Sequence, residues 1–451
     1  MRPALLIRRL SRLFRIRAGE GALVFLLGFL LMGNSFALEV SDVLAISGFL
    51  DQVGLQGLLV VWVIDMLLII LTAGLQSLVV DRFRRTQIMQ WMCLVLALVY
   101  LLLRFLFLIP SLAWLNYSLL YLLSDQQWLF FPLVFWVMAN DIFDVAGAKR
   151  LFPLIAAGGL LGRVAGLLVA AAAPTVFGWL GYPSAALLSV NSLIYLGLFF
   201  LILWKVPRTA FRDSSYHRLP MRETLAEGQE FIRNVSSFKY LTFSLVAMGL
   251  ALTIIEYHFL AVSHAAYEQA DRFQTFYSLY RLGETLLAVA IQGFITSRLI
   301  DRISLKNSFL LLPATSLVSI TWMLAIPGIL SGTGGRLISR LVMSTIDESA
   351  RKAFQGLVPE ARRGRVSMFM DSYLFAIGTI LGSLILAAII FIASRNPELS
   401  SPRTYLIAAF LVTLGAVGLV IKMRQNYDMS LLNWRLTRRR RGTSTLDRLD
   451  F

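Results

Sequence analysis

Acidic and basic side chains lie inside long apolar stretches of this sequence, where an ionised group is costly. On insertion scales a charge at the centre of a bilayer costs at least about 2.5–3.5 kcal/mol, so each one needs a partner or a function. The residues of this kind are Glu39, Asp42, Asp65, Asp125, Arg163, Glu256, His258, Arg281, Glu284, Arg340 and Asp371. Embedded carboxylates bind protons, coupling ions or cationic groups, and embedded arginines bind anionic groups. The set therefore predicts solute binding.

Glu39 and Glu256 occupy matching places in two similar halves of the chain, 217 residues apart. Each stands toward the outer part of its apolar stretch, and we expect both to face a central cavity. Under one interpretation they bind a cationic group, a proton or a coupling ion. Under the other they are structural partners of Arg163, Arg281 or Arg340, and the sequence leaves both interpretations open.

Arg163 closes the glycine-rich segment 158–163, Gly-Gly-Leu-Leu-Gly-Arg. Glycines let neighbouring membrane helices approach closely, so the arginine is expected to point into the helix bundle. Binding of an anion is one interpretation, and a salt bridge to Asp125 or Asp42 is the other. Arg281 and Glu284 stand three residues apart on one helix face, where they can pair locally.

Charged residues also follow the second and eighth apolar stretches. Asp81, Arg84 and Arg85 come after the second stretch, and Asp301 and Arg302 come after the eighth. We interpret them as a cytoplasmic gate in which arginines pair with carboxylates across the interface of the halves. The arginines also fit a plain topology signal, and the two interpretations are compatible.

Other chemistries have little support in the sequence. Three histidines and one cysteine, Cys93, do not suggest a metal cluster or a disulfide framework. No glycine-rich phosphate loop that ends in Lys-Ser or Lys-Thr occurs, and no paired catalytic set is visible. We expect no enzyme activity, no cofactor and no metal. The basic residues lie in short connections and tails, so we do not expect nucleic-acid binding.

The elements that must position these residues are transmembrane helices. Of 451 residues 57% are hydrophobic and 15% are charged, and the mean hydropathy is +0.72. A helix needs about 20 apolar residues to cross a bilayer, and its backbone must be satisfied within the segment. We predict an all-α polytopic membrane protein with spans near 20–49, 56–80, 86–109, 117–143, 151–173, 182–204, 238–263, 272–297, 306–326, 333–355, 365–393 and 402–423.

The charge pattern orients these helices. The net charge is +16, and arginines crowd the N-terminal tail and the run 438–441 near the C-terminus. By the positive-inside rule both tails are cytoplasmic, which predicts an inner-membrane protein with an even number of spans. Residues 3–17 alternate apolar residues with arginine, as in an amphipathic helix on the anionic membrane surface.

The spans fall into two six-helix halves with major-facilitator-like pseudo-symmetry. Asp81-Arg82 after the second span is repeated as Asp301-Arg302 after the eighth. The predicted parts are an amphipathic segment 1–19, a first half 20–204, a cytoplasmic linker 205–236, a second half 237–424 and a basic tail 425–451.

Several segments carry a family resemblance. Residues 135–140 read Phe-Trp-Val-Met-Ala-Asn, and 148–155 read Ala-Lys-Arg-Leu-Phe-Pro-Leu-Ile. Together with 249–256, 347–359 and 371–378, they resemble the nucleotide (ATP/ADP) transporter family, a distant branch of the major facilitator superfamily. The resemblance implies nucleotide exchange, retains the embedded acid Glu256, and brings Asn140 and Asp371 into the candidate site.

The resemblance also has departures. Ser41, Ser124 and Thr379 stand where the family carries a lysine, an acid and a lysine, although Asp125 is adjacent to Ser124. Arg163, Arg281 and Arg340 are the candidates to replace the lost lysines.

Two functions follow from these observations. The first is an alternating-access secondary transporter, expected to be a monomer, that carries a small anionic solute such as ATP, ADP or another phosphorylated metabolite. The second is a transporter-like membrane module that senses or scaffolds without transport.

Overall fold

The computed structural model describes residues 20–80, 85–143, 145–205, 236–355, 366–367, 369–396 and 401–446. In these residues every regular element is helical, as predicted. The amphipathic segment 1–19, nearly all of the linker 205–236, and the gate residues Asp81 and Arg84 lie outside the described residues.

Helices occur at each place where the first half was predicted to cross the membrane. They are α2 (Glu20–Gln52), α3 (Gly57–Val80), α4 (Arg85–Leu106), α5 (Ala113–Ile142), α6 (Val145–Trp179) and α7 (Leu187–Lys205). Short 3₁₀ turns, η1 (Pro110–Leu112) and η2 (Ser184–Ala186), precede α5 and α7. The predicted boundaries are close to these ends.

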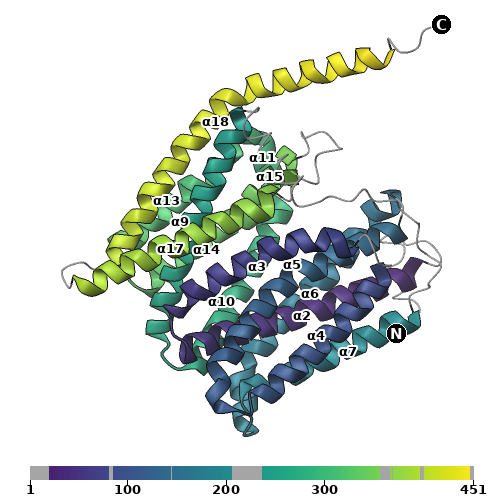
Figure 1. Ribbon diagram of the computed structural model, residues 1–451, viewed down its shortest axis with the longest axis vertical. Helices are drawn as coiled ribbons and strands as arrows, with labels where there is room; N and C mark the ends of the chain where they lie inside the picture. The colour runs from purple at the N-terminus through teal and green to yellow at the C-terminus, as the bar shows by residue number, and fades with distance from the viewer. Residues whose placement is uncertain are drawn as a thin grey trace. The chain divides into compact units, whose positions relative to one another are not determined.

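The second half is also helical at each predicted place, but several helices are interrupted. Its elements are α9 (Ser236–Ala266), α10 (Ala270–Ile291), η3 (Gln292–Thr296), α11 (Ser297–Ile303), α12 (Leu305–Ser308), α13 (Leu311–Ala325), α14 (Ile329–Val342), η4 (Met343–Asp347), α15 (Glu348–Gln355), η5 (Phe369–Tyr373), α17 (Leu374–Arg395) and α18 (Ser401–Leu446). The segments η3, η4 and η5 are π-helical, a conformation that often marks functional sites. In Figure 1, α18 continues as helix through most of the predicted basic tail.

Eight helices of the described chain are long and apolar enough to cross a membrane by length and composition. The predicted spans outside this set are α3, α5, α10 and the run from α14 to α15. Each of these helices carries charged residues within its length: Asp65 in α3, Asp125 in α5, Arg281 in α10 and Arg336 in α14.

The chain divides into two compact units. The N-terminal unit contains α2, α4, α5, α6, α7 and the segment Tyr267–Thr285, which includes the first part of α10. The C-terminal unit contains α9, residues Trp62–Gly74 of α3 and the chain from Leu286 onward. The predicted domain boundaries, which assign α3 and α10 whole to one half each, remain a prediction.

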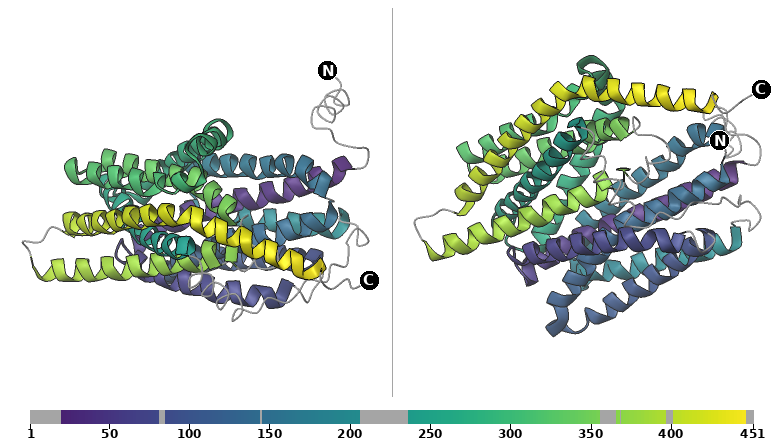
Figure 2. Two further views of the ribbon diagram at one scale, coloured as in Figure 1. Left: turned by 90° about the horizontal axis from the view of Figure 1, so that it is seen from above. Right: turned by 45° about the horizontal axis from the view of Figure 1, so that its top comes forward.

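Each unit is built around one central helix. In the N-terminal unit α2 packs against α5, α6 and α7, and α4 packs against α5 and α7 (Figure 1). In the C-terminal unit α9 packs against α14, α17 and α18, and α13 packs against α14 and α18 (Figure 2). These are the same neighbours in the same chain order, so the repeat seen in the sequence is also present in the packing.

Candidate functional site

Glu39 of α2 is the centre of an ion-pair cluster in the N-terminal unit. Its side chain is only 2% exposed, and Arg163 Nε of α6 lies 2.9 Å from Glu39 Oε1. Arg281 Nη2 of α10 lies 2.9 Å from Glu39 Oε2, and the same guanidinium pairs with Asp42. Two carboxylates and two guanidiniums therefore balance in charge within the membrane interior.

Close packing of α6 on α2 brings Arg163 to Glu39. A Cβ added at Gly162 would overlap the backbone of Met32 in α2, and one at Gly166 would lie 2.7 Å from the carbonyl oxygen of Phe36. The added Cβ at Gly166 would also lie 3.3 Å from Cβ of Glu39. Small residues thus let the helices touch at the turn that carries the acid.

The members of this cluster differ in exposure. The Arg163 side chain is 43% exposed, whereas Arg281 is 25% and Asp42 is 15% exposed. Arg281 also lies over the ring of Tyr277, with Cζ 5.7 Å from the centroid. Arg163 is thus anchored on a buried acid while much of its side chain remains accessible. Of the partners predicted for Arg163, which were Glu39, Asp125 and Asp42, the structure shows Glu39.

Glu256 of α9 belongs to a second ion pair, in the C-terminal unit. Arg336 Nε of α14 donates to Glu256 Oε2 at 2.7 Å, and Arg336 Cζ lies 4.6 Å from the ring centroid of Phe259. Here the arginine is buried, with 6% of its side chain exposed, and the acid is 26% exposed. The sequence analysis did not single out Arg336. The signal for it was a charge directly after Gly334-Gly335, within a predicted membrane span.

Equivalent glycines make equivalent helix contacts within each half. Gly378 and Gly382 of α17 follow Gly162 and Gly166 by 216 residues. A Cβ added at Gly378 would lie 3.0 Å from Cα of Gly249 in α9, which follows Met32 by 217 residues. The position that corresponds to Arg163 is therefore Thr379, whose side chain is buried.

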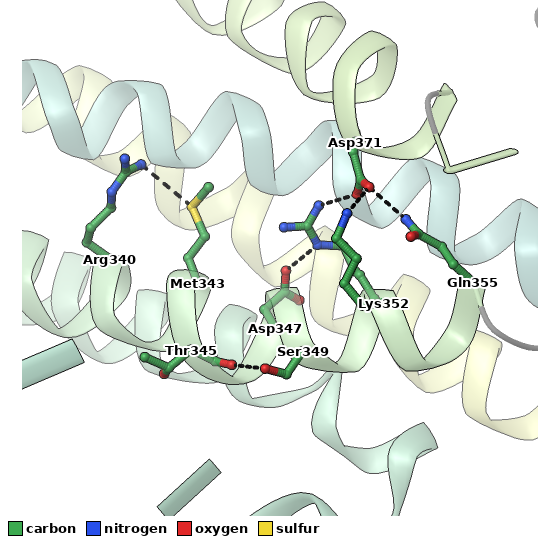
Figure 3. Close-up of polar contacts among 9 residues, drawn as sticks. Arg340, Met343, Thr345, Asp347, Ser349, Lys352, Gln355 and Asp371 are labelled. Atoms are coloured by element: carbon green, nitrogen blue, oxygen red, sulfur yellow. Dashed lines mark hydrogen bonds and ion pairs between the residues drawn. The ribbon is translucent and has the colours of Figure 1, made fainter. Parts of the chain in front are cut away.

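A further charged cluster joins α15 to η5 in the C-terminal unit (Figure 3). Arg351 Nε donates to Asp347 Oδ2 at 2.9 Å, and Arg351 Nη1 donates to Asp371 Oδ1 at 3.1 Å. Lys352 Nζ and Gln355 Nε2 donate to Asp371 Oδ2 at 2.6 and 3.0 Å. Asp371, predicted from the resemblance to bind substrate or an ion, is thus saturated by donors near the end of two helices.

The predicted gate residues lie in different surroundings. Arg85 at the start of α4 pairs with Asp141 near the end of α5. Asp301 and Arg302 are exposed on α11.

Three remaining candidates lie outside these clusters. Asn140 is exposed and donates to the carbonyl oxygen of Trp136 at 2.8 Å. Arg340 is exposed, with Nη1 3.9 Å from Sδ of Met343 (Figure 3). Asp125 is half-buried on α5. Among the described residues no group of three His, Cys, Asp or Glu side chains could hold a metal ion.

Sequence reasoning missed a buried polar network because it searched for charges. In the N-terminal unit Gln127 of α5 bonds to Tyr100 of α4, to Tyr195 of α7 and to Asn34 of α2. Ser41 of α2 extends the network, since its hydroxyl donates to Tyr100 Oη at 2.8 Å and accepts from Asn191 Nδ2 at 2.8 Å. In the C-terminal unit His258 Nδ1 lies 2.9 Å from Tyr405 Oη, 217 and 214 residues after Ser41 and Asn191.

Comparison with known families adds the decisive observation. The sequence profile of the TLC ATP/ADP transporter family matches residues 85–345, which is more than half of the chain. The chain belongs to the TLC ATP/ADP transporter family. The matched region contains Arg163, Glu256, Arg281 and Arg336, so both ion-pair sites contribute residues to it.

Solved structures of other transporters share the fold of this family member. The nucleoside transporter NupG aligns with a TM-score of 0.64 at 13% identity, over 90% of this chain and 99% of its own. A bacterial homologue of the iron transporter ferroportin in an inward-facing state gives 0.61 at 16% identity, over 89% and 98%. The peptide transporter POT in complex with sulfate gives 0.62 at 13% identity, over 89% and 95%. Comparison with curated proteins gives no match.

Family and fold agree on the broad function. This TLC family member is a multi-pass membrane protein and a transporter, and its fold is shared by the solved transporters above. Its family and fold are those of carriers that move a small solute. The predicted fold class and transporter function are confirmed.

Proposed function

We propose that this transporter exchanges nucleotides, with ATP and ADP as the first substrates to test, and that Arg163 binds a phosphate group. The observation that carries the proposal is the anchoring of Arg163. Its Nε is held 2.9 Å from the buried Glu39, while 43% of its side chain is exposed. A guanidinium fixed at one nitrogen keeps other N–H donors for a second anion, and such donors match the oxygens of a phosphate.

Arg281 is the second phosphate partner in this proposal. It contacts both Glu39 and Asp42, and its side chain is 25% exposed. A substrate phosphate competes with these carboxylates for the guanidinium. Since the cluster is neutral without substrate, the ion pairs also keep the charged groups tolerable in the membrane when the site is empty.

The transport cycle we propose is alternating access, in which the site opens to one side of the membrane at a time. Substrate that takes over arginine contacts from Glu39 or Asp42 changes the ion pairs that join α2, α6 and α10. Glu256, Asp125, Asn140, Arg340 and Asp371 remain predicted site residues, and the predicted gate remains a proposal as well.

The experiment is uptake of labelled ATP and ADP by proteoliposomes that contain the purified protein. We expect exchange above the rate of empty vesicles for the wild type. Arg163→Gln should raise KM by about tenfold or more, because a hydrogen bond to a charged group contributes about 1.5–3 kcal/mol. Arg163→Lys keeps the charge, and its KM should lie between those of the wild type and Arg163→Gln.

Arg403→Gln is the matched control, because Arg403 is an exposed arginine near the start of α18. It should leave KM unchanged. Exchange no faster than in empty vesicles would remove the nucleotide assignment. Unchanged KM in Arg163→Gln would remove Arg163 from the site. Uptake of no tested solute above the rate of empty vesicles would favour the sensing or scaffolding alternative.

The cellular setting belongs to the same proposal. The positive-inside pattern supports an inner-membrane location with both termini cytoplasmic, and we propose that the transporter works as a monomer. Reporter fusions at each terminus test the first point: activity of a periplasmic reporter at either end contradicts it. Mass measurement of the detergent-solubilised protein tests the second.

A further inference from the structure

Pro174 leaves a backbone carbonyl without its helical partner inside α6. Proline has no N–H, so it cannot donate to the carbonyl of the residue four positions earlier. In α6, which contains Pro174 within its length, that residue is Ala170. Ala170 is fully buried, and a buried carbonyl without a donor is costly. This position therefore needs a donor from another element.

Gln274 of α10 supplies that donor. Its Nε2 donates to the carbonyl oxygen of Ala170 at 2.9 Å, and the Gln274 side chain is itself buried, with 3% of the residue exposed. The adjacent Thr275 donates from Oγ1 to the carbonyl oxygen of Ala171 at 3.2 Å. Two neighbouring side chains of α10 thus bond to the backbone of α6 one turn before the proline.

The same face of α10 carries Arg281 to the Glu39 cluster. Gln274, Ser278 and Arg281 are spaced by four and three residues, so they lie along one side of the helix. Seven residues of helix span about 10 Å. A helix held at Gln274 is fixed in height and rotation, and this places the Arg281 guanidinium against Glu39 and Asp42.

We propose that Gln274 is a positioning residue for transport: by occupying the carbonyl freed by Pro174, it seats α10 on α6 and sets Arg281 in the substrate site. The role of Arg281 in that site rests on the function proposed above. Gln274 lies in the part of α10 that groups with the N-terminal unit, and the residues of α10 from Leu286 onward group with the C-terminal unit.

The first test asks whether Gln274 satisfies the carbonyl oxygen of Ala170. Gln274→Leu should lower the apparent melting temperature of the purified transporter by about 2 °C or more, because a buried carbonyl loses its donor. Adding Pro174→Ala restores an N–H within α6 that can donate to Ala170. The double variant Pro174→Ala/Gln274→Leu should therefore recover the melting temperature. A double variant that stays as unstable as Gln274→Leu alone overturns the assignment of Gln274 to this carbonyl.

The second test measures the coupling of Gln274 to Arg281 and needs no substrate. In the Pro174→Ala background, Arg281→Gln is made with Gln274 retained and with Gln274→Leu. Positions about 10 Å apart with no shared partner normally contribute additively. We expect the melting-temperature loss from Arg281→Gln to shrink by half or more when Gln274→Leu is present. An equal loss in both backgrounds means that Gln274 does not position Arg281, and the proposal fails.

Transport of ADP completes the test. The Pro174→Ala/Gln274→Leu variant should show a raised KM for ADP at a restored melting temperature. Pro174→Ala alone should keep the wild-type KM, because the Ala170 carbonyl has two lone pairs and still accepts from Gln274 beside the restored N–H. Wild-type KM in the double variant overturns the positioning role in transport. If the wild type carries no ADP, the nucleotide proposal fails, while the melting-temperature cycle still decides whether Gln274 positions Arg281.

Discussion

Glu39 and Glu256 lie at equivalent places in the two units, yet their ion pairs are built in opposite ways. Around Glu39 the acid is the buried member, and the accessible partner is Arg163. Around Glu256 the arginine is the buried member: Arg336 lies against Phe259, and the acid is the more exposed partner. The N-terminal unit therefore presents a guanidinium, and the C-terminal unit presents a carboxylate.

The contrast teaches that the repeat preserves helix packing and not charge. Gly162 and Gly378 bring α6 onto α2 and α17 onto α9 in the same register. Next to these glycines, however, Arg163 corresponds to the buried Thr379. The arginine for Glu256 comes from α14 instead. One scaffold thus supports two sites of different polarity.

The largest expected effect is a loss of stability when the glutamate of an ion pair is replaced by glutamine, and its size depends on how deeply the partner arginine is buried. Glu256→Gln removes the carboxylate that pairs with the buried Arg336, and breaking a buried ion pair by removing one partner costs about 3–5 kcal/mol. Glu39→Gln leaves Arg163 and Arg281, which are 43% and 25% exposed, and Arg281 keeps Asp42. We expect Glu256→Gln to lower the unfolding free energy more than Glu39→Gln, measured by chemical denaturation in detergent.

A paired variant makes this prediction sharper. Glu256→Gln combined with Arg336→Met removes both charges and should recover a large part of the lost stability, since apolar replacements of buried ion pairs are often neutral. A greater loss in Glu39→Gln, or no recovery in the paired variant, would mean that exposure does not explain the contrast between the units.

The second expected effect tests the shared register of the glycines. A Cβ in Gly162→Ala would overlap the Met32 backbone, and one in Gly378→Ala would lie 2.8 Å from the carbonyl oxygen of Val246. Overpacking of this kind costs about 1–3 kcal/mol, so both variants should be destabilised. Gly197→Ala is the control, because nothing lies within 4 Å of its added Cβ. Equal stability of Gly162→Ala and Gly197→Ala would show that α6 does not rest on α2.

The sequence was sufficient for the helices and for the pairing of the repeats. Apolar runs predict helix positions because each run must satisfy its own backbone in the membrane. The positions of Glu39 and Glu256 revealed the repeat, since an embedded acid is rare enough to mark equivalent places. The pairing of Glu39 with Arg163 and Arg281 was one of the two interpretations that the sequence left open.

The partners of Glu256 and Asp371 could not be derived in the same way. Arg336 reaches Glu256 only because of the rotation of α14 on α9, which a hydropathy pattern does not determine. Asp371 lies in the π-helical η5, and Arg351 follows the π-helical η4. An extra residue in a helical turn changes which side chains share a face, so spacing rules for regular helices fail there.

The smallest expected effect compares the polar interiors of the units through two tyrosines. Tyr195→Phe removes a hydroxyl that donates to Asn34 Oδ1 at 2.8 Å and accepts from Gln127. Gln127 Nε2 still donates to Asn34 Oδ1 at 3.2 Å, so the loss should stay near the net value of one hydrogen bond, about 0.5–1.5 kcal/mol.

Tyr405→Phe removes a similar hydroxyl from a place without this redundancy. Nδ1 of the buried His258 loses its partner at 2.9 Å, and its Nε2 already lacks one. An unsatisfied buried group costs about 1–3 kcal/mol, so Tyr405→Phe should destabilise the protein more than Tyr195→Phe in the same denaturation assay. The removed atoms are the same in both variants, and the difference between them therefore measures how well each unit can reuse the remaining donors and acceptors. The opposite order would mean that the C-terminal unit reuses its remaining donors and acceptors better than the N-terminal unit does.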